Sequence, residues 1–183
     1  MISNLFTRRH FSLRLASLFS GVSVAGMAFA SGSGAKSPGL AGKEEVSHNS
    51  EGIHQEVEFK ASRKRIYEAL LDAKFFEYAK QFAKITGGAP TEVSRELGGT
   101  FSIFGGHIVG RQLELTPDVR IVQAWRVVDW DPGIYSIAKF ELKEHGAGAR
   151  LIFDHSGFPE GKGMHLADGW NSHYWDSLQK YLT

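Results

Sequence analysis

The sequence predicts an α+β protein in which a sheet of antiparallel strands is covered by a long C-terminal helix. Three observations predict this class. Most segments between residues 53 and 156 alternate apolar and polar side chains, as the strands of a half-buried sheet do. Short turns containing glycine or proline separate these segments, which favours antiparallel neighbours. From Leu166 onward, the large apolar residues change to the four-residue step of a helix.

The first thirty residues have the features of an export signal. They contain a motif that resembles the twin-arginine pattern, Thr7-Arg8-Arg9-His10-Phe11-Ser12-Leu13. An uncharged run from Leu15 to Ala30 follows and ends in Ala28-Phe29-Ala30, the small-x-small pattern of a signal peptidase site. We therefore expect residues 1–30 to be a cleaved twin-arginine signal peptide and the mature protein to be periplasmic or extracellular.

An uncleaved leader would instead anchor the protein to the membrane. The uncharged run has sixteen residues, fewer than the roughly twenty that a membrane-spanning helix needs. Cleavage is therefore the favoured interpretation, and we expect no membrane contact once the leader is removed.

A linker and one domain account for the rest of the chain. Residues 31–52 are rich in glycine, serine and scattered charges and have no hydrophobic periodicity, which predicts a flexible linker. The domain predicted over residues 53–183 has an ordinary size for one hydrophobic core.

The composition excludes several classes of function. The chain has no cysteine, so disulfides, thiolate nucleophiles and cysteine-ligated metal sites are excluded. Its formal charge is +1, but three arginines lie in the first thirty residues, and the remaining 18 basic and 20 acidic residues give −2. A near-neutral protein lacks the positive field that phosphate backbones require, so we expect no nucleic-acid partner.

The first half of the domain predicts one strand, two short helices and three further strands. Residues 53–60 alternate with the period of a strand. Ser62 and Asp72 each precede apolar residues at helical spacing and are predicted to cap two helices. After a break at 86–90, strands are expected at 92–97, 100–104 and 108–115.

Turns and alternation predict three more strands in the second half. The turn at 116–118 leads into a strand at 120–128. Residues 138–143 alternate strictly between apolar and charged side chains, which predicts one covered and one wet sheet face. The last strand, 150–156, places His155 on the same face as Leu151 and Phe153.

The closing helix is predicted over residues 166–182. Its apolar stripe is made by Leu166, Trp170, Tyr174, Leu178 and Leu182. His173, Trp175 and Tyr181 are predicted to flank that stripe. Because the apolar face of the sheet has to be covered, this helix is its expected cover.

Several short motifs occur in an informative order and spacing. In the strands they are GGTFSIFG at 98–105, IVG at 108–110, LTPD at 115–118 and IVQAWR at 121–126. FDHSGFP at 153–159 and GWNSHYW at 169–175 follow near the end of the chain. Together they resemble the SRPBCC superfamily, and within it the branch similar to activators of the heat-shock-90 chaperone ATPase.

The resemblance implies a helix-grip fold, in which a curved antiparallel sheet wraps around a long C-terminal helix, often with an apolar cavity between them. Aromatic side chains with polar handles suit such a cavity, although packing of a core explains them equally well. The expected lining consists of Phe101, Phe104, Trp125, Phe140, Phe153, His155, Trp170, His173 and Tyr174.

Histidines are the candidates for acid–base chemistry. His155, His173 and His107 each titrate near neutral pH in their unperturbed state. Asp154 is not expected to orient His155, because adjacent strand residues point to opposite faces. His155, His165 and His173 are spaced by ten and eight residues, which matches no metal-binding motif. We therefore expect no metal and no cofactor, and hydrogen-bonded histidines at a pocket wall remain the alternative to catalysis.

Three functions stay open at this point. The first is an exported binding protein that holds a small hydrophobic or amphipathic ligand between sheet and C-terminal helix. The second is a cofactor-free enzyme of the cyclase or hydrolase type that uses one of these histidines as acid or base. The third is a protein-interaction module like the chaperone activators, but the chaperone they serve is cytosolic and the leader predicts export. The oligomeric state is also open.

Overall fold

The computed structural model describes residues 51–83 and 88–183. The predicted signal peptide, and all of the predicted linker before Glu51, lie outside the described residues. Within those residues, no helix combines the length and apolar character needed to cross a membrane. The prediction of a leader, a linker and one domain thus stays a prediction.

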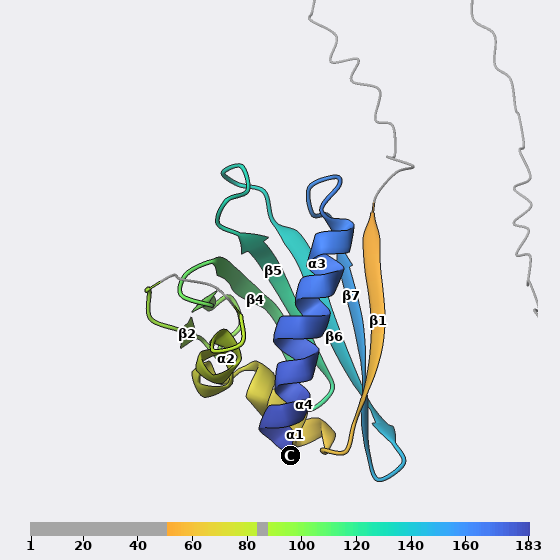
Figure 1. The fold of residues 1–183 in the computed structure, drawn as a ribbon. Helices are drawn as coiled ribbons and strands as arrows, with labels where there is room; N and C mark the ends of the chain where they lie inside the picture. The colour runs from red at the N-terminus through yellow and green to blue at the C-terminus, as the bar shows by residue number, and fades with distance from the viewer. Residues whose placement is uncertain (1–50, 84–87) are drawn as a thin grey trace, which may run out of the picture. The chain divides into compact units, whose positions relative to one another are not determined.

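A seven-stranded antiparallel sheet forms the body of the fold, with strands in the order β1-β7-β6-β5-β4-β3-β2 (Figure 1). The strands are β1 (Gly52–Phe59), β2 (Glu92–Val93), β3 (Thr100–Ile103), β4 (Ile108–Thr116), β5 (Arg120–Val127), β6 (Ser136–His145) and β7 (Gly148–Ser156). Because β7 pairs with both β6 and β1, the chain's first and last strands are neighbours.

Helices α1 (Arg63–Leu70) and α2 (Ala73–Lys80) follow β1, as the capping residues predicted. The Ser62 hydroxyl accepts a hydrogen bond from the backbone N–H of Arg65, and the Asp72 carboxylate accepts one from Lys74. These bonds satisfy amide donors that have no partner within the first turn of a helix. Both short helices are therefore fixed by their own sequences.

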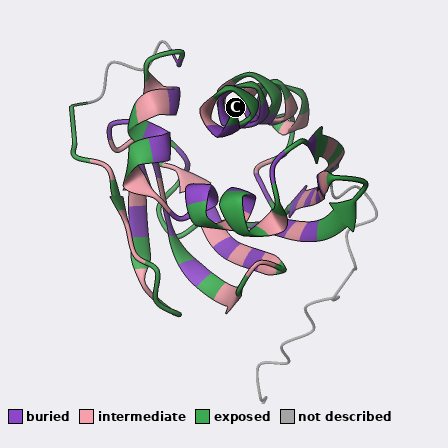
Figure 2. Cartoon of the chain, turned by 90° about the horizontal axis from the view of Figure 1, so that it is seen from below, coloured by how far each residue is buried: buried purple, intermediate pink, exposed green. Residues whose placement is uncertain are grey.

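The sheet has an inner face covered by the helices and an outer face that is not (Figure 2). Side chains alternate between the two: Ser136, Ala138, Phe140 and Leu142 of β6 are buried on the inner face. The sheet curves around the C-terminal helix, so the helix-grip fold implied by the resemblance is confirmed.

The strand predicted at 92–97 is wrong beyond Val93. The Ser94 hydroxyl accepts a hydrogen bond from the Glu96 amide, and Gly98 has a φ of 77°, so the chain turns. Such local bonds to a serine side chain compete with the ladder of a sheet. The alternation of residue types in this segment therefore reflects a loop that leads into β3.

The C-terminal helix begins at α3 (Gly163–Gly169), passes through a π-helical segment η1 (Trp170–Trp175) and ends as α4 (Asp176–Leu182). In η1 the Asp176 amide donates to the Asn171 carbonyl, five residues earlier. The wider π turn rotates Trp175 toward the sheet, where it is 2% exposed and stacked on Trp170. The prediction that Trp175 flanks the stripe is therefore wrong, whereas the stripe itself is buried as predicted.

Candidate functional site

Eight of the nine residues predicted to line a ligand cavity are buried, on the inner face of the sheet, on the C-terminal helix or, for Phe104, in the turn after β3. Phe140, Phe153 and His155 come from β6 and β7, and Trp125 comes from β5. His173 is only partly buried. The sequence therefore identified the side chains that meet between the sheet and the helix.

These aromatic rings pack against one another. The Trp170 ring lies 4.2 Å from that of Phe153 and 4.1 Å from that of Tyr174, between ring centroids. Phe104 continues the cluster, with its centroid 5.4 Å from that of Tyr174. Distances of this size are those of aromatic side chains in contact. The rings thus occupy the space in which the resemblance implies a cavity.

His155 joins the sheet to the helix through a chain of hydrogen bonds. The Trp170 indole N–H donates to Nδ1 of His155 at 3.0 Å. Nε2 of His155 lies 2.7 Å from the Ser136 hydroxyl, which in turn donates to the Trp125 carbonyl at 2.8 Å. Because Nδ1 accepts a bond, the bonding pattern assigns the proton to Nε2 of a neutral imidazole.

Burial keeps His155 neutral. The side chain is 1% exposed, and desolvation lowers its pKa from 6.5 to about 4. Asp154 lies on the outer face, where it accepts a bond from His54, so it does not orient His155. A base needs an unoccupied lone pair, and that of His155 is taken by Trp170. This geometry is that of a structural histidine, and Ser136 and Trp170 are partners that the sequence did not identify.

The other predicted histidines lie elsewhere. Nδ1 of His173, in η1, is buried and finds no hydrogen-bond partner among residues 51–83 and 88–183. Burial lowers the pKa of His173, and the nearby His165 lowers it further. His107 lies in the turn between β3 and β4, where its carbonyl accepts from the Val128 amide. Among residues 51–83 and 88–183, no three metal-binding side chains converge.

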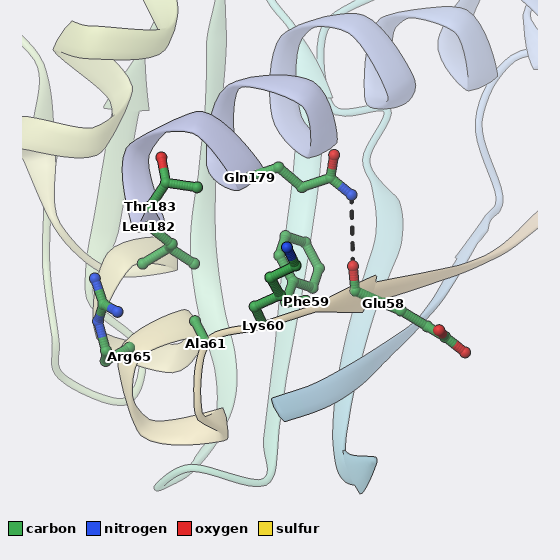
Figure 3. Close-up of a pocket in the computed structure, with 8 residues that line it drawn as sticks. All are labelled: Glu58, Phe59, Lys60, Ala61, Arg65, Gln179, Leu182 and Thr183. Carbon is green, nitrogen blue, oxygen red and sulfur yellow. Dashed lines mark hydrogen bonds between the residues drawn. The ribbon is translucent and has the colours of Figure 1, made fainter. Parts of the chain in front are cut away.

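A groove with a volume of about 530 Å³ lies at the C-terminal end of the last helix (Figure 3). We call it the end groove; it lies between the end of β1, the start of α1 and the end of α4. The Gln179 amide crosses from α4 to the Glu58 carbonyl at 3.5 Å. The end groove is lined by Glu58, Phe59, Lys60, Ala61, Arg65, Gln179, Leu182 and Thr183.

The end groove has an apolar floor and charged walls. Phe59, Ala61 and Leu182 are buried and form the floor. The carboxylate of Glu58 is already paired with Arg150, at 2.9 Å, and with His145, at 3.0 Å. Lys60 and Arg65 are exposed and form no ion pair with another described residue.

Sequence reasoning did not find the end groove. Its residues form no motif, because they come from the end of β1, the connection that follows it, the start of α1 and the end of α4. Only the fold brings residues 58–65 next to residues 179–183. The sequence pointed to this groove only through two apolar residues, Phe59 at the end of β1 and Leu182 at the end of α4.

Comparison with known families agrees with this fold. The family model described as "Activator of Hsp90 ATPase homolog 1-like protein" matches residues 60–183. The human "Activator of 90 kDa heat shock protein ATPase homolog 1" is 23% identical over 92 residues, which are 50% of this chain and 27% of the human protein. An uncharacterized protein of Schizosaccharomyces pombe is 28% identical over 115 residues, 62% of this chain and 32% of that protein. The matches thus span about a third or less of these relatives.

Solved structures have the same architecture. An HSP90 activator from Plasmodium falciparum superimposes with a TM-score of 0.64 at 23% identity, covering 72% of this chain and 95% of the other. CalU16 from Micromonospora echinospora superimposes with a TM-score of 0.59 at 19% identity, covering 73% and 77%. These likenesses establish the fold. Because the family model also matches more than half of the sequence, the chain belongs to the Activator of Hsp90 ATPase homolog 1-like family.

Proposed function

We propose that this protein is an exported binding protein that takes a small amphipathic molecule with an anionic head in the end groove. The observation that carries the proposal is the contrast between two places beside the C-terminal helix. The middle of the sheet–helix interface is filled by aromatic rings, whereas its end is open over about 530 Å³. A groove of this volume is in the range that small-molecule sites occupy.

The apolar part of the ligand would lie on Phe59, Ala61 and Leu182. Their side chains face the groove from β1, from the turn before α1 and from α4, so an alkyl chain placed there contacts three elements at once. Each buried CH₂ contributes about 0.8 kcal/mol. A chain of eight to ten carbons would therefore supply most of the affinity.

The head group would lie at Lys60 and Arg65. Both are cations on the groove wall, and Glu58 is already paired with Arg150 and His145, so the groove favours a negative charge. Guanidinium and ammonium groups bind carboxylates through charge-assisted hydrogen bonds. These features favour a carboxylate or a similar anion over an uncharged head.

Calorimetric titration with decanoate tests the ligand class. We expect decanoate to bind the purified protein more tightly than decan-1-ol, and the double variant Lys60→Gln/Arg65→Gln to weaken decanoate binding about tenfold. Lys143→Gln/Lys162→Gln removes two positive charges elsewhere on the surface and should leave the affinity unchanged. Equal affinity of both double variants would remove the end groove as the site, and no binding at about 1 mM decanoate would remove the ligand class.

Export is tested by where the chain accumulates. Expressed in full in a bacterium with a twin-arginine translocase, the protein should appear in the periplasm as a mature form that begins at Ser31. Arg8→Lys/Arg9→Lys should leave the precursor in the cytoplasm, because the paired arginines are the recognised feature. Equal export of Arg14→Lys serves as the control. A wild-type chain that stays cytoplasmic at full length would contradict the proposal.

A second candidate is a protein-interaction module that acts on a chaperone. The names of the curated relatives favour it, since several are activators of the 90 kDa heat shock protein ATPase. The same fractionation separates the candidates, because an exported protein does not meet a cytosolic chaperone. The enzyme hypothesis has less support, because the lone pair of His155 is occupied by Trp170.

A further inference from the structure

Two glutamine side chains bridge β1 and the C-terminal helix. In the middle of β1, Gln55 accepts a hydrogen bond from the Trp175 indole N–H at 2.6 Å and donates one to the Ala167 carbonyl at 3.1 Å. Near the end of β1, the Gln179 amide donates to the Glu58 carbonyl at 3.5 Å. The strand and the helix thus lie side by side, and because β1 is an edge strand, the seam between them follows the edge of the sheet.

The two bridges differ in strength. Gln55 is partly buried and uses both the oxygen and the nitrogen of its amide. Gln179 is exposed, and its bond to Glu58 has a length at the upper limit for a hydrogen bond. A bond between exposed groups costs little to break, because water replaces the lost partner. Gln55 is therefore a firm bridge, and Gln179 is one that a ligand can displace.

The end groove stops at the Gln179 bridge. Its lining residues on β1 begin at Glu58 and those on α4 begin at Gln179, the two residues that the bridge joins (Figure 3). On the other side of the bridge lies Val57, which is partly buried against the core. Val57 shares the inner face of β1 with Phe59 of the groove floor, because side chains of a strand alternate. Apolar surface therefore continues past the bridge until it reaches Gln55.

We infer that Gln179 sets the length of the alkyl chain that the end groove accepts, an inference that rests on the function proposed for that groove. With the bridge intact, a chain whose head lies at Lys60 and Arg65 ends over Phe59. Without the bridge, the chain can continue along β1 over Val57. Two residues of a strand span about 7 Å, which is room for about five further methylenes. Gln179 is therefore a specificity-determining residue.

The polar chemistry of the bridge explains how it selects by length. A methylene placed between the Gln179 amide and the Glu58 carbonyl separates a donor from its acceptor and hydrogen-bonds to neither. Only a chain that extends past Phe59 meets this penalty, so shorter chains leave the bridge intact. In Gln179→Ala the donor is gone, and a long chain then has no hydrogen bond to break. The substitution should therefore favour long chains and leave short ones unaffected.

Calorimetric titration with octanoate, decanoate, dodecanoate and tetradecanoate, each below its micelle concentration, tests the inference. In the wild-type protein we expect the affinity to rise up to decanoate and then to level off. In Gln179→Ala it should keep rising, with tetradecanoate at least about tenfold tighter than decanoate, because each buried CH₂ is worth about fourfold. Gln81→Ala makes the same change at the exposed C-cap of α2 and should keep the wild-type profile. Both glutamines are exposed, so neither substitution is expected to unfold the protein.

The methyl resonances of Val57 in NMR spectra give a second readout. In Gln179→Ala, tetradecanoate should shift them more than decanoate does, because only the longer chain extends past the position of the bridge. If decanoate binds but Gln179→Ala and Gln81→Ala have the same chain-length profile, the inference is wrong and the proposed function stands. The same holds if tetradecanoate leaves the Val57 resonances of Gln179→Ala unchanged. If the wild-type protein binds none of the four carboxylates, the inference and the proposed ligand class are both wrong.

Discussion

Replacing Trp170 by alanine is expected to lower the free energy of unfolding by about 3–5 kcal/mol. The indole is 2% exposed and packs against Phe153, Tyr174 and Trp175. Its removal leaves a cavity in the middle of the sheet–helix interface and also deprives His155 of a donor. Urea unfolding followed by far-UV circular dichroism at about pH 7.5 measures the change.

Two further variants show which part of Trp170 matters. Trp170→Phe keeps most of the ring but leaves Nδ1 of His155 without its donor, so it should cost about 1–3 kcal/mol. Met164→Ala truncates a residue of the same helix that is 82% exposed and should change stability by less than about 0.5 kcal/mol. If Trp170→Ala and Met164→Ala cost the same, the interface is not packed as described.

Lowering the pH from about 7.5 to about 4.5 is expected to cost about 2–3 kcal/mol of stability through His155 alone. Burial lowers the pKa of His155 from 6.5 in the unfolded chain to about 4 in the folded protein. Between these values the unfolded chain binds a proton that the folded protein does not. The contribution is therefore complete above pH 6.5 and is lost as the pH falls toward 4.

His155→Gln provides the test, because an amide can accept from Trp170 and donate to Ser136 but does not titrate. We expect the free energy of unfolding of this variant to depend less on pH over that window. His54→Gln is the control, since its exposed ring has a pKa that the bond to Asp154 raises, so its contribution is lost as the pH rises. An unchanged slope in His155→Gln would contradict the assigned network.

The fold was largely predictable from local patterns. The caps Ser62 and Asp72 started α1 and α2 where predicted, because a cap bond involves residues that are two or three apart. The hairpin of β4 and β5 followed from the turn at 116–118, where Asp118 has a φ of 59°. The end of β2 was predicted wrongly, because whether residues 94–97 join the sheet depends on whether a neighbouring strand lies within hydrogen-bonding distance of them.

The candidate site was predictable only in part. Alternation placed His155 correctly on the inner face, but Ser136 and Trp170 are 19 and 15 residues away from it in the chain. The π turn in η1 has no signature that distinguishes it from an α-helix in the sequence. Whether a cavity forms depends on how neighbouring rings tilt, and the volumes of the side chains alone do not decide that.

The sequence alone determined the family, the order of the strands along the chain and the residues that face the core, because period and capping are local properties. It also predicts a twin-arginine leader, which the fold of the domain does not test. Only the tertiary structure decided that rings fill the middle of the interface while its end stays open. The physical reason is that packed interfaces and grooves form where elements distant in the chain meet. Their shape depends on side-chain rotamers and on where strands end, and no local sequence pattern encodes either.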